Sequence, residues 1–422
     1  MSVMFSLLVA SLLAAQVFAG EQEVPLVTQC PGLQAWPLLN TSCPAVQHNI
    51  FDMLWISESE ENNMCRVDSK MCHLEGSSIG LAKNQRDCIT GSSAVYCVYL
   101  FSDFARGRGL SVVASPSVIP TIRYALSALD PRYELDAPGL FFEKPLPGRG
   151  IGLISNHAFK KGDLILTSTP LFMIQERAMS DMSKADRLQL QRLSISALPA
   201  RSRALFYDLA AHFGGDKTDD VLLTNGFSAT FGDSKEGFGI VVPEAARLNH
   251  DCRPNARFAF DPRTMVHKIH AARAIEPGEE LTVSYIDEKE IYSARQQHIK
   301  AHWGFDCECK LCSAPGQVRN TSDTHLRRIT ALRKSLFLFT VENCRKVTPD
   351  MALELVSLYE EEGLHGALAE AYMVTSLWYC VWGNVRETKK WASLAIENWL
   401  VWEAGGEANL QGMRNLTRQP QS

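Results

Sequence analysis

The segment Cys307-Glu-Cys309-Lys-Leu-Cys312 places three thiols within six residues. Thiols at this spacing can face one tetrahedral metal ion but cannot all pair among themselves, so a metal site here needs a fourth ligand. The cysteines outside the N-terminal block that could supply it are Cys252, Cys344 and Cys380. Cys252 lies in a polar segment, whereas the other two lie in apolar helical surroundings. We therefore predict one zinc ion held by Cys252, Cys307, Cys309 and Cys312, with redox-active or disulfide-bonded thiols as the alternative.

The composition is that of a folded protein with several cores. The chain has 422 residues, of which 46% are hydrophobic and 21% are charged. That is enough apolar material for two or three cores of ordinary size. The formal net charge of -5 argues against a basic nucleic-acid-binding surface, so no direct contact with nucleic acid is expected.

The first twenty residues have the pattern of a signal peptide. They carry no charged side chain, and an apolar run from Phe5 to Phe18 ends in small residues before Glu21. The run is shorter than the roughly 20 residues that a membrane span needs, so the mature chain is expected to have no span. We predict cleavage after Ala19 or Gly20 and entry into the secretory pathway. An uncleaved anchor and a mispredicted start codon are the alternatives.

Six cysteines precede residue 100 and form a separate block. They are Cys30, Cys43, Cys65, Cys72, Cys88 and Cys97. Behind a signal peptide, an even number of cysteines in one block is typical of a disulfide framework, here of three bonds. The alternative is a set of free or buried thiols in a cytosolic protein.

Hydrophobic periodicity and turn residues divide the rest of the chain. Residues 21–135 form a Cys-rich region with short strands, and residues 140–290 combine strands with a helical insert at about 175–235, broken near Pro199. Two strands, at 151–154 and 164–166, are expected to be joined by a turn. Residues 320–405 are helical, with Asn384 and Glu387 forming a capping box, and resemble one tetratricopeptide-like pair.

Four stretches, in this order along the chain, resemble one family. They are Arg149-Gly-Ile-Gly-Leu153, Arg247-Leu-Asn-His-Asp-Cys-Arg-Pro-Asn-Ala256, Gly278-Glu-Glu-Leu-Thr-Val-Ser-Tyr285 and Trp303-Gly-Phe-Asp-Cys-Glu-Cys-Lys-Leu-Cys312. They are similar to the SET-domain methyltransferases, within the branch of SMYD proteins and fungal SET-domain proteins. The resemblance covers residues 140–315, extends loosely to the C-terminal helices, and does not account for residues 21–135. The insert contains no cysteine, so the MYND zinc finger of true SMYD proteins is missing.

The resemblance implies an α+β fold. Its parts are a β-rich SET domain at 140–290 with a helical insert and a pseudoknot-like crossing, a post-SET zinc loop at 291–315, a C-terminal helical region and the N-terminal Cys-rich region. It also implies an S-adenosylmethionine-dependent protein-lysine N-methyltransferase that acts on a lysine of a protein or peptide. We expect a monomer. Related enzymes work inside the cell, so the nucleus or cytoplasm is the alternative location.

The resemblance also assigns roles to individual residues. The implied cofactor-binding residues are Arg149, Gly150, Ile151, Gly152, Asn249, His250, Tyr285 and Phe305. Tyr285 is the implied catalytic residue, and Trp303 is expected to line the substrate channel. Ordinary turn geometry and core packing are the alternatives for these residues. Asp251 stands where the family commonly has Ser, which adds charge beside the metal.

Two other functions compete with the enzyme. The first is a catalytically silent SET fold that binds peptides, and the second is a secreted, disulfide-stabilised interaction protein that acts through its N-terminal block. A closed shell of four thiolates leaves no position on the metal for substrate. The zinc is therefore predicted to be structural, both in an active methyltransferase and in a silent SET fold.

Overall fold

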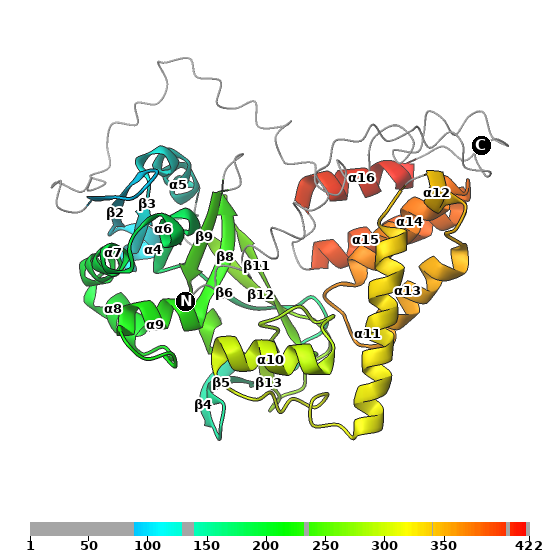
Figure 1. Cartoon of the computed structure of the whole chain (residues 1–422), viewed down its shortest axis with the longest axis horizontal. Coiled ribbons are helices and arrows are strands. Elements are labelled where there is room, and N and C mark those ends of the chain that lie inside the picture. Colours follow the sequence, from blue (N-terminus) through cyan, green and yellow to red (C-terminus); the bar gives the residue numbers. More distant parts are fainter. Residues whose placement is uncertain (1–87, 129–138, 232–235, 340, 402–405, 419–422) are drawn as a thin grey trace, which may run out of the picture.

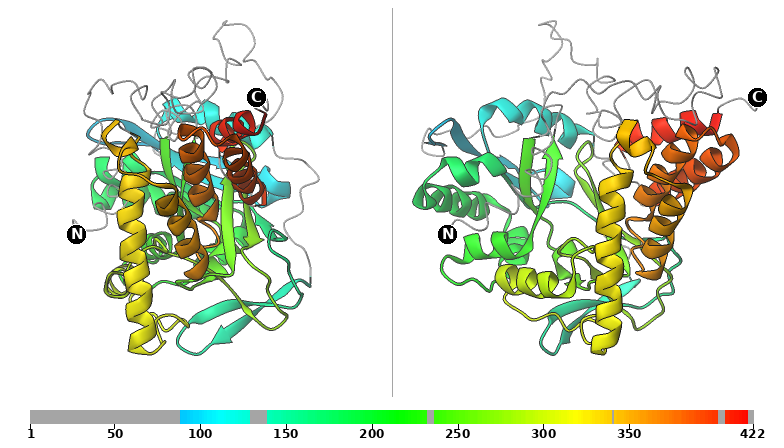
Figure 2. Two further views of the ribbon diagram at one scale, coloured as in Figure 1. Left: turned by 90° about the vertical axis from the view of Figure 1, so that its right-hand side faces the viewer. Right: turned by 45° about the vertical axis from the view of Figure 1, so that its right-hand side comes forward.

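The computed structural model describes residues 88–128, 139–231, 236–339, 341–401 and 406–418 (Figure 1). Within these ranges, three sheets and their covering helices form a β-rich part, and a block of helices follows it towards the C-terminus (Figure 2). The α+β class predicted from the sequence is confirmed. The predicted signal peptide and Cys30, Cys43, Cys65 and Cys72 lie outside the described residues.

The largest sheet has the strand order β1-β2-β3-β7-β9-β8. Its strands are β1 (Cys88–Thr90), β2 (Val95–Phe101), β3 (Leu110–Ala114), β7 (Phe172–Gln175), β8 (Gly226–Phe231) and β9 (Glu236–Val241). All neighbours pair antiparallel except β3 and β7, which are parallel. Because β3 pairs with β7, the segment 88–114 shares a sheet with strands that follow residue 170. The boundary predicted near residue 135 therefore does not separate two sheets.

Disulfides occur at both ends of the described chain. Cys88 and Cys97 are register partners on β1 and β2 and form a disulfide. The sequence predicted disulfides within this block but not which cysteines pair, so the structure adds the pairing of Cys88 with Cys97. Cys344 and Cys380 are also disulfide-bonded, whereas the sequence suggested only that they occupy apolar helical positions.

Two smaller sheets carry the segments that contain the candidate site. Their orders are β10-β13-β5-β4 and β11-β12-β6. The strands are β4 (Phe141–Leu146), β5 (Gly150–Ser155), β6 (Leu164–Ser168), β10 (Asn249–His250), β11 (Ala256–Asp261), β12 (Val266–Ala271) and β13 (Glu280–Val283). The two predicted strands at 151–154 and 164–166 are present, but they enter different sheets, since β5 pairs with β4 and β6 pairs with β12.

A buried asparagine fixes the segment that crosses beside β13. β10 runs parallel to β13. Asn255, which is 3% exposed, accepts a hydrogen bond from the backbone N–H of Thr282 at 2.8 Å and donates one to the carbonyl of Glu280 at 2.8 Å. A side-chain amide is suited to this position because it can donate and accept at once. Residues 249–255 are thus held along the strand that leads to Tyr285.

The helical insert covers one face of the large sheet. Its helices are α6 (Glu176–Asp181), α7 (Lys184–Ala197), α8 (Ala200–Tyr207) and α9 (Lys217–Asn225). The predicted break near Pro199 separates α7 from α8. Apolar residues of these helices and of β2, β3, β7 and β9 form one core cluster. The remaining short helices of this part are α4 (Phe104–Gly107), η5 (Pro116–Val118), α5 (Ile119–Ser127) and η6 (Ala245–Arg247).

Helices joined by loops make up the described C-terminal part. Its elements are α10 (Tyr292–Trp303), α11 (Gly316–Leu336), α12 (Val341–Cys344), α13 (Pro349–Glu361), α14 (Leu368–Val381), α15 (Val385–Val401) and α16 (Gly406–Arg418). The predicted cap is present, because the Asn384 side chain accepts a hydrogen bond from the Glu387 N–H at 3.1 Å. None of the described helices combines the length and the apolar character that a membrane crossing requires.

A buried carboxylate ties the helical part to the cysteine-bearing segment. Glu362 accepts hydrogen bonds from Arg253 Nη2 at 2.7 Å, Ser322 Oγ at 2.6 Å and His325 Nδ1 at 2.9 Å. Burial alone would raise the pKa of Glu362, but the hydrogen bonds from Ser322 and Arg253 hold that pKa below its usual value. Arg253 directly follows Cys252, so the position of the cysteine depends in part on the helical block.

Candidate functional site

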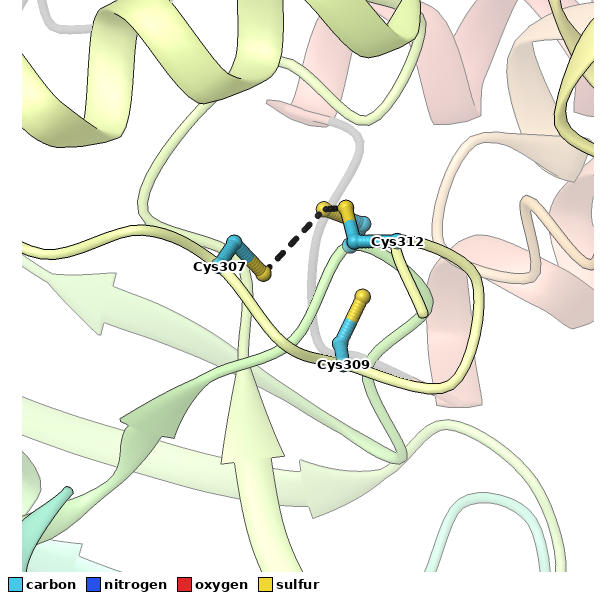
Figure 3. Close-up of side chains that lie close together, drawn as sticks. Cys307, Cys309 and Cys312 are labelled. Atoms are coloured by element: carbon cyan, nitrogen blue, oxygen red, sulfur yellow. Dashed lines mark hydrogen bonds between the residues drawn. The ribbon is translucent and has the colours of Figure 1, made fainter. Parts of the chain in front are cut away.

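The structure brings Cys252 together with the three cysteines of the late segment. All four thiols are buried, and their sulfur atoms lie within 4.8 Å of one another. Figure 3 shows the side chains of Cys307, Cys309 and Cys312 converging. The Cys252 sulfur lies 3.9 Å from that of Cys307 and 3.6 Å from that of Cys312. A disulfide would need about 2.05 Å, whereas a Zn–S bond of about 2.3 Å gives a tetrahedral edge of about 3.8 Å.

The four sulfurs are also chemically suited to a metal. Hydrogen bonding within the cluster raises the pKa of Cys252, through Cys307 first, and lowers the pKa of Cys309, through Cys252 first. Buried thiols this close to one another therefore do not all keep the pKa of a free cysteine, and at least one of them favours the thiolate form. Thiolate is the form that binds a metal. Both the distances and the donor set fit a four-thiolate zinc site.

Helix α10 covers this cluster. Ile299 is fully buried among the cysteines. The Gln296 side chain donates to the carbonyl of Cys307 at 2.8 Å and accepts from its N–H at 2.9 Å. These two hydrogen bonds order the cysteine loop independently of a metal ion.

His250 connects the cysteine cluster with the backbone of Tyr285. Its Nδ1 accepts the Tyr285 N–H at 3.1 Å, and its Nε2 lies 3.4 Å from the Cys252 sulfur. Burial lowers the pKa of His250 to about 4, so the ring is neutral near pH 7. Because Nδ1 accepts, the single proton lies on Nε2 and is donated to the sulfur. One imidazole thereby links the candidate metal ligand to the candidate catalytic residue.

The phenol of Tyr285 is held in one position. Its hydroxyl donates to the carbonyl of Leu248 at 2.8 Å, and its ring lies 5.2 Å from the ring of Trp303. Burial raises the pKa of Tyr285 above its ordinary value. The hydroxyl is therefore protonated at neutral pH and acts as a hydrogen-bonding group rather than as a base.

Arg149 and Asn249 both contact Glu280, which was not among the residues predicted from the sequence. Glu280 on β13 accepts a hydrogen bond from Asn249 Nδ2 at 2.8 Å and pairs with Arg149 Nη2 at 3.2 Å. Arg149 also donates to the carbonyl of His250 at 3.1 Å. The sequence does show that Glu280 is a polar residue in a short apolar strand, five residues before Tyr285. No spacing in the sequence connects Glu280 to Arg149.

The two glycines of the Arg149–Gly152 turn have different constraints. Gly150 has φ of +69°, a conformation that favours glycine, and the space beside it is open. Gly152 instead faces protein, since an added Cβ would lie 2.9 Å from Asn249 Nδ2 and 2.8 Å from Glu280 Oε1. The family resemblance implied that both glycines bind the cofactor. The open space beside Gly150 fits that expectation, whereas the need for glycine at position 152 comes from the neighbouring side chains.

Replacing Gly152 with Ala is expected to lower the free energy of unfolding by about 1–3 kcal/mol, because the added methyl overpacks the contact with Asn249 and Glu280. The matched control is Gly239→Ala in β9, where a Cβ would meet its nearest atom at 3.5 Å. Chemical denaturation of both variants provides the comparison. Equal stabilities would contradict the packing argument.

The remaining predicted residues lie at the edge of this arrangement. Phe305 is half-buried against the cysteine cluster, and its predicted contact with adenine stays a prediction. Asp251, the departure from the family pattern, accepts a hydrogen bond from the Arg253 N–H at 2.8 Å. Burial raises the pKa of Asp251 to about 6, so the extra carboxyl carries less charge near neutrality than an exposed aspartate.

One family model matches the middle of the chain, where the candidate site lies. Residues 150–286 match the family model described as the SET domain. This range includes β5, β13, Cys252 and Tyr285. Residues 150–286 are therefore similar to a SET domain.

Three individual proteins show how much of this chain has similar relatives. Histone-lysine N-methyltransferase set5 of Schizosaccharomyces pombe is 27% identical over 244 residues, which is 56% of this chain and 70% of that protein. Histone-lysine N-methyltransferase SMYD1 of Homo sapiens is 30% identical over 126 residues, 27% of this chain and 25% of its own length. Histone-lysine N-methyltransferase SET5 of Meyerozyma guilliermondii is 41% identical over 69 residues, 16% of this chain and 14% of its own length. The chain thus spans most of the first relative and a quarter or less of the other two.

One solved structure has a loose likeness to this chain. The SET domain of LSMT bound to lysine and AdoHcy aligns over 72% of this chain and 89% of that chain, with 12% sequence identity and a TM-score of 0.28. This likeness is too loose to bear on the site.

Proposed function

We propose that this protein is an S-adenosylmethionine-dependent protein-lysine N-methyltransferase with a structural zinc ion. The observation that carries the proposal is the hydrogen-bonded connection from the Cys252 sulfur through His250 to Tyr285. Relatives named histone-lysine N-methyltransferases support the reaction class.

The cofactor would be held by residues that converge from separate segments. Arg149, Asn249 and His250 are joined around Glu280 and the His250 carbonyl. The open side of Gly150 leaves room beside the backbone of the same turn. Phe305 completes the proposed set from the post-SET loop. When bound, S-adenosylmethionine supplies a methyl group on a positively charged sulfur.

Tyr285 would align the reacting groups. Because its hydroxyl donates a hydrogen bond to the Leu248 carbonyl, the lone pairs of the same oxygen can accept weak C–H contacts of about 0.5–1 kcal/mol each. A substrate lysine must also lose a proton, which costs about 4 kcal/mol near neutral pH. The burial that raises the pKa of Tyr285 would also favour the neutral amine of a lysine beside it, since burial penalises charge. The protein's main contribution to the rate would be geometry.

The test is methyl transfer by the purified full chain. Isotope-labelled S-adenosylmethionine and a eukaryotic protein extract are expected to yield methylated lysine residues, identified by mass spectrometry. Calorimetry of the same preparation is expected to detect binding of the methyl donor. Donor binding without transfer would favour a silent SET fold that binds peptides, and neither binding nor transfer would overturn the proposal.

We propose that the chain enters the secretory pathway. The Cys88–Cys97 disulfide and the disulfide-bonded Cys344 and Cys380 support an oxidising compartment. The intact mass of protein made in eukaryotic cells is expected to show cleavage after Ala19 or Gly20 and several disulfides. An uncleaved chain with reduced Cys88 and Cys97 would place the protein in the nucleus or cytoplasm instead.

A further inference from the structure

A buried arginine lies beside the cysteine cluster without enough partners for its charge. Arg295 in α10 is 0% exposed. Its Nη1 donates to the carbonyl of Glu290 at 2.5 Å. Within the part of the chain that the structure describes, its Nε and Nη2 have no hydrogen-bond partner. A fully buried arginine is rare unless it is paired, so these two donors need an explanation.

Arg295 lies in α10 between Tyr292 and Ile299, which both pack against the cysteine cluster. The negative charges that act on this guanidinium are those of Cys252, Cys312 and Asp323. Arg295 lies one helical turn before Ile299, which packs among the same cysteines. The unpartnered N–H groups are therefore placed where thiolate sulfurs are the available acceptors.

A metal at this position would explain the arginine. Four thiolates around one Zn²⁺ leave two net negative charges, and burying them is costly unless nearby groups compensate. We propose that Arg295 is a positioning residue for the zinc ligands: its guanidinium compensates one of these charges and donates N–H groups to the sulfurs of Cys312 and Cys252. This inference rests on the zinc assignment of the proposed function.

A second donor acts on the same cluster from another segment. His250 Nε2 donates to the Cys252 sulfur. Charge-assisted N–H bonds to thiolates withdraw electron density from sulfur, which lowers its nucleophilicity. With Arg295 and His250 both in place, the thiolates are expected to resist alkylation and oxidation, a useful property in an oxidising compartment.

The experiment measures zinc rather than catalysis. Competition with a chromophoric chelator gives the zinc affinity of the full chain and of the Arg295→Gln variant. The variant is expected to bind zinc about 10–100-fold more weakly, as is typical when a partner of a metal ligand is removed. Its zinc-bound thiolates are also expected to react faster with iodoacetamide. The control is Lys300→Gln, which removes a positive charge from the exposed face of the same helix, where Lys300 pairs with Asp306.

A second variant covers the possibility that Arg295→Gln fails to fold. Arg295→Lys keeps the charge but loses the fork of N–H donors. With Co²⁺ in place of zinc, this variant is expected to shift the sulfur-to-metal charge-transfer band. A purely structural arginine would leave that band unchanged. A folded Arg295→Gln with zinc affinity within twofold of the wild type, or an unshifted band in Arg295→Lys, would overturn the inference.

Zinc binding by the wild type tests the metal assignment, and the comparison with Arg295→Gln tests the role of Arg295. A wild-type protein that binds no zinc would overturn the metal assignment, and the role of Arg295 with it. A zinc-loaded wild type with an unaffected Arg295→Gln variant would overturn the role of Arg295 and leave the structural zinc in place.

Discussion

Replacing Tyr285 with Phe is expected to lower the rate constant of methyl transfer by about 100-fold, the effect of a small loss of alignment at a reacting centre. The substitution removes only the hydroxyl, which donates to the Leu248 carbonyl. Loss of this one bond is expected to cost about 1 kcal/mol of folding stability, so the variant should remain folded. Because the Tyr285 backbone N–H and ring remain, donor binding should change far less than the rate. The measurement combines the methyl-transfer rate with calorimetry of the methyl donor.

The control for this substitution is Tyr292→Phe. Tyr292 also packs beside the cysteine cluster, and its ring carries the guanidinium of Arg319 rather than facing Leu248. It should keep the wild-type rate. If Tyr285→Phe and Tyr292→Phe have the same activity, the catalytic assignment of Tyr285 is wrong.

Replacing Cys309 with Ser is expected to weaken zinc binding by more than about 100-fold, beyond the effect of losing a partner outside the ligand shell. Zinc binding in such sites contributes directly to folding. Since His250 joins the Cys252 sulfur to Tyr285, loss of the metal should also loosen the residues proposed to hold the methyl donor. We expect lower zinc content by atomic emission, a lower melting temperature and loss of donor binding.

The matched control for the metal is Ser313→Ala in the same loop. Ser313 donates to the carbonyl of Glu308 at an exposed position and leaves all four thiols intact. It should bind zinc and the methyl donor normally. A Cys309→Ser variant that retains wild-type donor binding would show that the cysteine cluster does not support the cofactor site.

Much of the site could be predicted from the sequence because its chemistry is local. The spacing of Cys307, Cys309 and Cys312 limits what three thiols can do, and the polar surroundings of Cys252 distinguished it from Cys344 and Cys380. The structure agrees on the grouping, with the four sulfurs within 4.8 Å of one another. Likewise, the break near Pro199 and the cap at Asn384 follow from the properties of single residues and are both present.

The missed features depend on residues far apart in the chain. Glu280 meets Arg149 across 131 positions only because β5 pairs with β13. Pairing of β3 with β7 places a segment of the Cys-rich region in the central sheet, and periodicity within either strand gives no information about its partner. From the sequence, Arg295 looks like an ordinary solvent-exposed arginine of a helix. Its burial follows only from the packing of α10 against the cysteines.

The amino-acid sequence by itself determined the candidate residues for the chemistry: the four cysteines from their spacing and surroundings, and the Asn249-His250 pair and the tyrosine after β13 from the family resemblance. Only the tertiary structure decided how they act on one another, through the His250 bridge from Cys252 to Tyr285, the Glu280 pairing and the guanidinium of Arg295 beside the sulfurs. The physical reason is that residue identity sets which protons and charges a group can offer. Hydrogen bonds and charge compensation act over a few ångströms, and those distances exist only after distant segments have packed together.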